Sequence, residues 1–273
     1  MTMADIATVT PELEAACRKL IEGVQLGGPY LPNGYNRLRL QFPGNHGGVN
    51  WGGASFNPAL GLMFVNTSEY GQLQGYADRT TTAVSAPAAG AGGRDGDPEL
   101  AQQAPPPGRG RGRGRGGGGG GGASNVPYGN VPGGGRFMDQ ASKMMCQQPP
   151  WGNLTAINVH TGEFAWQVPL GVTDTLPPEK QKTGRPGNGG SIATAGGLVF
   201  IGATDDSRFR AFDARTGREL WVVKLGAAAH AVPSTYQGAD GRQYVVITST
   251  GGGFLDAPTA DDSITAFALP ARR

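Results

Sequence analysis

The sequence has few of the side chains on which most metal and redox-active protein sites depend. Its 273 residues include only two cysteines and three histidines. Cys17 and Cys146 fit neither a metal-binding motif nor a disulfide framework, so we expect two free thiols, and the pair does not indicate a redox compartment. The histidines show no spacing typical of metal ligands, and we expect structural or solvated roles for His46, His160 and His230.

The sequence also lacks a strong net charge and any long apolar run. The formal net charge of +2 argues against a general preference for nucleic acid or an anionic membrane surface. No apolar stretch is long enough to predict a membrane-spanning helix. The N-terminus has no basic start followed by an apolar core, so no secretory signal is predicted.

One sequence pattern of 13 residues occurs twice in the chain. Residues 154–166 read LTAINVHTGEFAW and residues 209–221 read FRAFDARTGRELW, so Trp166 and Trp221 are 55 residues apart. A fixed period of this size indicates a repeat architecture. Each copy alternates apolar and polar residues on both sides of Thr-Gly, which predicts a β-hairpin with glycine in a positive-φ turn position. We expect the tryptophans to pack between neighbouring units.

Alternating segments around the two copies predict units of four strands. The strands of the complete unit are expected near 191–194, 198–202, 208–213 and 219–225, and those of the preceding unit near 53–57, 62–66, 154–158 and 163–169. Repeated four-stranded sheets are typical of β-propeller blades. Because three units cannot close a ring of about four to eight blades, we predict an all-β fold that is part of a propeller.

The predicted organisation has four parts. Residues 1–45 hold a short helix, over residues 10–24, and the end of a preceding blade. Residues 46–171 form a blade interrupted by a Gly/Arg/Pro-rich insertion at 85–135, residues 172–226 form a complete blade, and residues 227–270 form a terminal blade without its outer strand.

The insertion carries four Arg-Gly repeats at 109–116 and an uninterrupted glycine run to residue 122. Such a segment buries too little apolar surface to offset its ordering entropy. One reading is an RNA-binding tract; the other is a flexible surface insertion kept soluble by its arginines. Because no aromatic residue alternates with the arginines to stack on bases, we favour the second reading and expect no nucleic-acid partner.

Several segments resemble the C-terminal part of dehydrogenases that depend on pyrroloquinoline quinone (PQQ), with the membrane-type glucose dehydrogenases as the nearest branch. They are GGVNWGGASFNPALGLMFVN, PPWGNLTAINVHTGEFAWQVPLG, GGLVFIGATDDSRFRAFDARTGRELW and the final YVVITS and DSITAFALP. The element with Thr-Gly and Trp matches that family's tryptophan-docking motif. The resemblance covers nearly all of the chain from about residue 11, apart from the insertion.

The resemblance implies an eight-bladed propeller with PQQ at its centre and a divalent cation, Ca²⁺ or Mg²⁺, beside it. It implies oxidation of a sugar or alcohol in the periplasm and transfer of electrons to ubiquinone or a cytochrome. The family's catalytic Asp and Lys have no counterpart here, and no ligand of the cation is found in this chain. The missing N-terminal blades are therefore expected partners, and we expect the chain to be incomplete on its own.

Four residues on connecting loops match positions near the cofactor in the family. Asn50 and Trp51 match the family's Asn-Trp-Gly-Gly, Asn188 occupies the equivalent loop of the next unit, and Asp206 matches an acidic residue near the pocket. The alternative is that these residues only shape turns. Gly252 stands where some members carry a histidine, so any role of that histidine is absent.

A non-catalytic scaffold or binding module is the competing function. Propellers with tryptophan-docking repeats also act as protein scaffolds, for example in outer-membrane assembly. The missing catalytic Asp and Lys favour this alternative, and the retained cofactor loops favour the dehydrogenase.

Overall fold

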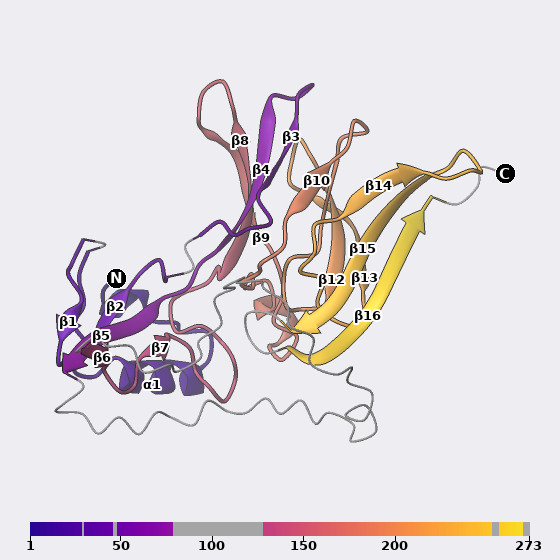
Figure 1. The fold of residues 1–273 in the computed structure, drawn as a ribbon. Coiled ribbons are helices and arrows are strands. Elements are labelled where there is room, and N and C mark those ends of the chain that lie inside the picture. Colours follow the sequence, from indigo (N-terminus) through magenta and orange to yellow (C-terminus); the bar gives the residue numbers. More distant parts are fainter. Residues whose placement is uncertain (29, 46–47, 79–127, 253–256, 270–273) are drawn as a thin grey trace, which may run out of the picture.

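Most of the regular structure of the described residues consists of β-sheets that stand side by side (Figure 1). The computed structural model describes residues 1–28, 30–45, 48–78, 128–252 and 257–269. The first sheet contains β3 (Ala54–Asn57), β4 (Leu62–Ser68), β8 (Gly152–Asn158) and β9 (Phe164–Pro169), in that order. The second contains β10 (Ser191–Ala193), β11 (Leu198–Ile201), β12 (Arg208–Asp213) and β13 (Glu219–Lys224).

A third sheet has three strands, β14 (Ser234–Gln237), β15 (Gln243–Gly252) and β16 (Ala257–Ala268). Neighbouring strands within all three sheets are antiparallel. The predicted fold class is confirmed, because these sheets have the strand order of propeller blades. The boundaries of the predicted domains remain a prediction.

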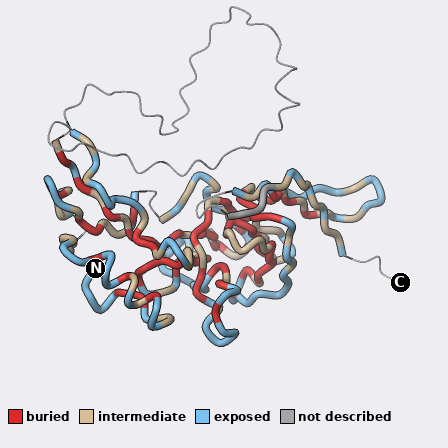
Figure 2. The backbone as a smooth tube through the Cα atoms, turned by 90° about the horizontal axis from the view of Figure 1, so that it is seen from below, coloured by how far each residue is buried: buried red, intermediate tan, exposed pale blue. Residues whose placement is uncertain are grey.

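Apolar side chains between the sheets hold them together. Phe64 and Leu154 of the first sheet share a buried cluster with Val199, Ile201 and Phe212 of the second. A further cluster joins the second sheet to the third through residues that include Phe209, Val245 and Ile247. Burying a large apolar side chain stabilises a fold by about 1.5–3 kcal/mol, so these contacts fix the angle between sheets. Figure 2 shows the buried residues concentrated in the interior and exposed residues at the hairpin tips.

The two copies of the repeated stretch adopt the same conformation. They form the hairpins β8–β9 and β12–β13, and each has an irregular register at the same place, after Ala156 and after Ala211. Gly162 and Gly217 of the Thr-Gly turns have φ of 76° and 71°. The indole Nε1 of Trp166 donates to the carbonyl of Ala214 in the next unit at 3.0 Å, so the expected docking between units is present.

A separate small sheet lies beside helix α1 (Pro11–Leu20). Its central strand is β5 (Gln72–Asp78), which pairs with β1 (Gly34–Tyr35), β2 (Arg39–Gln41), β6 (Tyr128–Asn130) and β7 (Gly135–Arg136). Short 3-10 helices at Met3–Asp5 and Pro178–Lys180 complete the regular structure of the described residues.

Two features of this region were not predicted. No strand was expected over residues 70–78, but β5 buries Leu73, Gly75 and Ala77 on one face and leaves polar residues on the other. In addition, β6 lies near the end of the predicted insertion at 85–135. Small residues such as glycine carry little signal for a strand, which is why the sequence concealed both. The Arg-Gly tract lies outside the described residues.

The expectation of two free thiols is wrong. Cys17 and Cys146 form a disulfide with an S–S distance of 2.00 Å and Cα atoms 5.2 Å apart. The two residues are 129 positions apart in the sequence. Both are buried in the core where α1 packs against the small sheet, together with Leu13, Leu73 and Phe137. Only this packing brings the sulfurs together, so sequence spacing did not reveal the pair.

Candidate functional site

Two glycine-rich loops meet where the first strands of neighbouring sheets begin. A Cβ atom on Gly52 would lie 2.3 Å from the carbonyl carbon of Gly189, and one on Gly190 would lie 2.1 Å from the carbonyl oxygen of Gly52. The two backbones therefore approach so closely that any larger residue would push them apart. Just beyond, the hydroxyls of Ser55 and Ser191 are hydrogen-bonded at 2.7 Å.

This close approach brings two of the expected cofactor residues together. The side-chain amide of Asn50 donates to Oδ1 of Asn188 at 3.3 Å. Oδ1 of Asn50 accepts from the backbone N–H of Trp51 at 2.8 Å, and the backbone N–H of Asn188 donates to the carbonyl of Ala203 at 3.1 Å. Because a carboxamide has two N–H donors, Asn50 keeps one for a further acceptor and Asn188 presents its own pair.

Trp51 follows Asn50 directly and is the most exposed tryptophan of the chain. Its exposed fraction is 71%, whereas Trp221 is 37% exposed and Trp151 is fully buried. An indole with so large an exposed fraction contributes little to the hydrophobic core. An exposed indole next in the chain to Asn50 offers a flat apolar surface, a group suited to contact with a planar molecule.

Asp206 lies in the adjacent loop, and its carboxylate is buried. It pairs with the guanidinium of Arg210 and accepts from the hydroxyl of Thr204 at 2.7 Å and from the backbone N–H of Val172 at 2.9 Å. Burial by itself would raise the pKa of Asp206, but the positive charge of Arg210 and these hydrogen bonds outweigh it, so the pKa lies below the ordinary 3.8.

The structure thus joins Asn50 directly to Asn188, with Trp51 next to Asn50 in the chain, and links Asp206 to Asn188 indirectly. The connection runs through the backbone, because Gly187 pairs with Thr204, whose hydroxyl donates to Asp206. That Asp206 contacts a cofactor remains a prediction. Its observed partners are groups of this chain, which fix the loop in place.

Sequence reasoning missed two further residues of this loop cluster. Arg185 makes a two-pronged ion pair with Asp205, with both N–O distances 2.9 Å, and the side chain of Asp205 is nearly fully buried. Adjacent aspartates in a loop were a visible signal, but nothing in the sequence identified a partner 20 residues away.

His230 is the second residue whose contacts the sequence did not reveal. Its ring is buried, with Nδ1 2.8 Å from the carbonyl oxygen of Ala203 and Nε2 3.3 Å from that of Gly252 at the end of β15. It therefore joins three segments of the chain, which is one of the two roles expected for it, structural or solvated. His46 lies outside the described residues.

The groups present fit one edge of a flat cofactor that carries carbonyl and carboxylate oxygens. The carboxamides supply donors, and the exposed indole supplies a stacking surface. The guanidinium groups nearby are paired with Asp205 and Asp206. Within the described residues, no group of three or more His, Cys, Asp or Glu side chains is arranged to hold a metal ion.

Comparison with known proteins decides the family. Residues 1–245 match the model of the family described as PQQ, glucose/ethanol/alcohol dehydrogenase, beta-propeller domain. The chain belongs to this family. The resemblance to PQQ-dependent dehydrogenases is confirmed, and the sheets described above are blades of a quinoprotein propeller.

This quinoprotein segment is similar to several much longer relatives. It is 34% identical to the glycerol dehydrogenase large subunit of Gluconobacter thailandicus, over 97% of the chain and 34% of that protein. The identity is also 34% to the quinate/shikimate dehydrogenase (quinone) of Acinetobacter baylyi, over 97% and 30% of the two proteins. The chain is also 34% identical to quinoprotein glucose dehydrogenase A of Acinetobacter calcoaceticus, over 99% of the chain and 31% of that protein.

The chain therefore spans about a third of the length of these relatives. The chain has the same sequence identity, 34%, to dehydrogenases named for glycerol, for quinate or shikimate, and for glucose. Sequence identity therefore does not single out the glucose dehydrogenases among these relatives. Among the described residues, no helix is both long and apolar enough to cross a membrane.

Proposed function

We propose that this chain is the C-terminal segment of a PQQ-dependent dehydrogenase that oxidises a sugar or alcohol and passes the electrons to ubiquinone or a cytochrome. In this proposal Asn50, Trp51 and Asn188 contact the cofactor. The observation that carries it is the hydrogen-bonded pair of Asn50 and Asn188 beside the exposed Trp51. These residues come from two blades and meet only because the glycine loops touch.

When bound, PQQ would supply the redox chemistry, as the acceptor of two electrons from the substrate. Asn50 and Asn188 would hold it through their carboxamide N–H donors, and Trp51 would offer its indole as an apolar contact surface. Asp206 would act indirectly, because its charge pair with Arg210 holds the loop that pairs with the backbone of Gly187, next to Asn188.

The rest of the active site comes from blades outside this chain. The catalytic Asp and Lys and the ligands of the Ca²⁺ or Mg²⁺ ion would lie there, so the segment works when the propeller is completed. The Cys17–Cys146 disulfide supports the periplasm as the compartment, because such bonds persist in oxidising surroundings and are rare in the cytosol.

A binding experiment tests the cofactor contacts. The full chain, combined with the upstream segment of its gene and Ca²⁺, is titrated with PQQ while tryptophan fluorescence is recorded. We expect saturable quenching. The dissociation constant for PQQ should be at least tenfold higher in Asn188→Ala, and the amplitude of the quenching should be mostly lost in Trp51→Phe. Tyr236→Ala, which changes an exposed aromatic residue of the third sheet, is the matched control and should bind PQQ normally.

Activity is measured on the same mixture by dye reduction with glucose, glycerol or ethanol. Reduction that depends on PQQ supports the proposal. Absence of both quenching and dye reduction contradicts it.

One observation favours the scaffold alternative: the Asp206 carboxylate is saturated with hydrogen bonds. It accepts from the hydroxyl of Thr204, from the guanidinium of Arg210 and from the backbone N–H groups of Val172 and Arg208, which use the acceptor sites that a cofactor would need. A scaffold would retain a stable protein partner after purification without PQQ and would show no quenching. Capture of such a partner by a chain that does not bind PQQ would favour this function over the dehydrogenase.

A further inference from the structure

The small sheet carries a row of tyrosines that the cofactor site does not use. In the register of β1, β5 and β6, Tyr35 pairs with Tyr76, Tyr76 pairs with Asn130, and Asp78 pairs with Tyr128. Paired residues lie on the same side of a sheet, and so do residues two positions apart on one strand. All five side chains therefore stand on one face.

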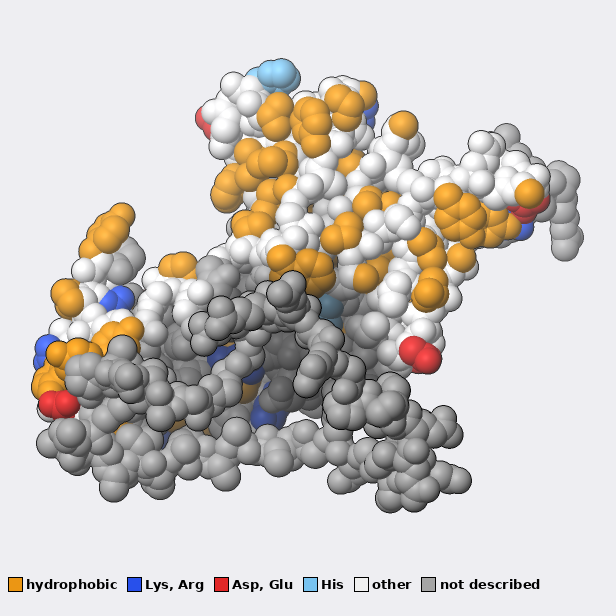
Figure 3. All heavy atoms as spheres, viewed as in Figure 1, with side chains coloured by type: hydrophobic (Ala, Val, Ile, Leu, Met, Phe, Trp, Pro, Cys, Tyr) orange, Lys and Arg blue, Asp and Glu red, His pale blue; other side chains and the backbone are white. Residues whose placement is uncertain are grey.

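The other face of β5 is occupied by the core. Leu73 and Ala77 are buried there, whereas Tyr35, Tyr76 and Tyr128 are 54%, 47% and 54% exposed. The tyrosines thus contribute little to the core. Three half-exposed rings on one small sheet offer an aromatic surface of the kind that marks a recognition site, and Figure 3 shows hydrophobic side chains over this part of the molecule, at the left.

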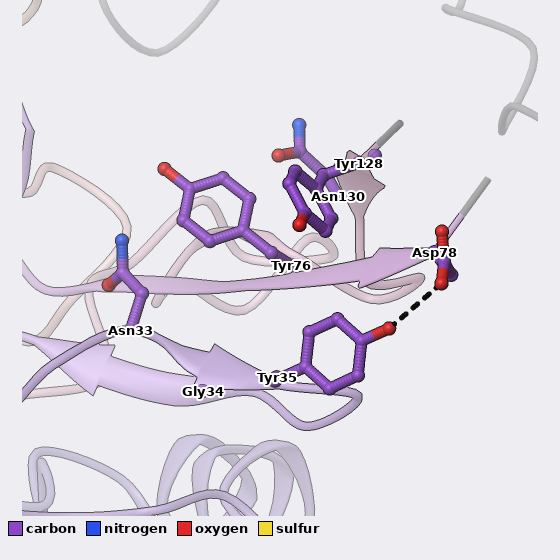
Figure 4. A pocket seen from close by; sticks show the side chains of 8 residues that line it. Asn33, Gly34, Tyr35, Tyr76, Asp78, Tyr128 and Asn130 are labelled. Carbon is purple, nitrogen blue, oxygen red and sulfur yellow. Dashed lines mark hydrogen bonds between the residues drawn. The ribbon is translucent and has the colours of Figure 1, made fainter. Parts of the chain in front are cut away.

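These residues line a cavity of about 640 Å³, which is within the range of small-molecule sites. Figure 4 shows the rings of Tyr35, Tyr76 and Tyr128 around it, with the carboxamides of Asn33 and Asn130 at its rim. The rings of Tyr35 and Tyr128 are nearly perpendicular, at 85°, with centroids 6.5 Å apart. The hydroxyl of Tyr35 donates to Asp78 at 3.1 Å.

Charge narrows the class of ligand. Among the described residues that line the cavity, Asp78 is the one ionisable group other than tyrosine, and none is Lys or Arg. A nucleic acid or another phosphate-bearing ligand would find no cation among these described lining residues, so both are disfavoured. Three tyrosine rings and the carboxamides of Asn33 and Asn130 make up most of the remaining lining, and such uncharged groups favour a neutral ligand.

We propose that this face of β1, β5 and β6 binds a neutral carbohydrate. A sugar ring has an apolar C–H face that stacks on tyrosine and hydroxyl edges that exchange hydrogen bonds with Asn33, Asn130 and Asp78. Residues of this site come from the small sheet, whereas Asn50, Trp51 and Asn188 lie where the first two blades meet. The proposal does not rest on the proposed dehydrogenase function.

Saturation-transfer NMR and calorimetry on the full 273-residue chain test it, with maltose and cellobiose as probes. We expect binding by at least one of the two sugars. Tyr76→Ala and Asn130→Ala should each weaken it about tenfold, with unchanged circular dichroism. Tyr236→Ala removes a tyrosine of similar exposure, 49%, from the third sheet and should leave sugar binding intact.

The Asp78→Asn variant distinguishes binding of a neutral ligand from binding of a cationic one, because it removes the negative charge of the cavity. Asparagine still accepts from Tyr35, so sugar affinity should change less than threefold. Tetramethylammonium and a single-stranded oligonucleotide are titrated in parallel. Failure of both sugars to bind, or binding that Tyr76→Ala and Asn130→Ala leave unchanged, would overturn the proposal. So would tight binding of tetramethylammonium that Asp78→Asn abolishes, or of the oligonucleotide.

Discussion

The indole of Trp166 lies directly on Gly217. A Cβ atom at Gly217 would be 2.6 Å from Cε3 of Trp166, and the indole N–H donates to the carbonyl of Ala214. Trp166 ends one copy of the repeated stretch, and Gly217 belongs to the Thr-Gly turn of the next. Glycine at this turn therefore serves two purposes, the positive φ of 71° and room for the ring of the preceding blade.

The first prediction separates these two purposes. Gly217→Ala should lower the free energy of unfolding by the cost of a left-handed alanine, about 1–2 kcal/mol, and by about 1–3 kcal/mol more for displacing the indole. Gly162→Ala is the matched control, since Gly162 has φ of 76° and no atom within 4 Å of an added Cβ. Urea unfolding of both variants gives the difference. Equal losses of stability would show that the indole contact contributes nothing.

The second prediction concerns the buried charge pair of Asp206 and Arg210. Asp206→Asn should lower the free energy of unfolding at pH 7 by about 3 kcal/mol, because it leaves a buried guanidinium without its main counter-charge. The pKa of Asp206 in the folded chain lies below 3.8, so the pair stabilises the fold above that pH. As the pH falls below 3.8 and through the lowered pKa, this stabilisation is lost.

Urea unfolding at pH 7, 4 and 2.5 checks this prediction. The difference between wild type and Asp206→Asn should shrink at the lowest pH. Asp240→Asn serves as a control, because its exposed carboxylate lies 3.9 Å from Arg242 and such pairs contribute less than about 1 kcal/mol. A pH-independent effect of Asp206→Asn would contradict the charge-pair explanation.

The third prediction is that the disulfide stabilises the small sheet and helix α1. Replacing both Cys17 and Cys146 by alanine should lower the free energy of unfolding by about 2–5 kcal/mol. A thiol assay on the denatured wild type should find no free thiol before reduction and two after it. A reducing agent should lower the melting temperature of the wild type and leave that of the double variant unchanged.

The fourth prediction uses the exposure of the tryptophans. Acrylamide should quench the emission of Trp51 strongly and that of Trp151 weakly, because their exposed fractions are 71% and 0%. Trp51→Phe should remove most of the accessible emission without altering the circular dichroism. If the accessible fraction stays the same in this variant, the indole of Trp51 is covered in solution.

The repeat carried most of the information about the blades. The strand alternation and the Thr-Gly turns are local properties, so residues 154–166 and 209–221 were sufficient to predict the hairpins and their docking tryptophans. The small sheet was not predicted, because β5 contains glycine and pairs with strands far from it in sequence.

Within the site, the sequence by itself determined which side chains the loops carry, namely Asn50, Trp51, Asn188 and Asp206. Only the tertiary structure decided what each one touches. Asn50 and Asn188 are 138 positions apart and meet because two blades pack against each other, and Asp206 faces inward because Arg210 is buried beside it. The Cys17–Cys146 bond was likewise decided by packing. Local pattern fixes hairpins and turns, whereas contacts between distant residues depend on how whole sheets fit together.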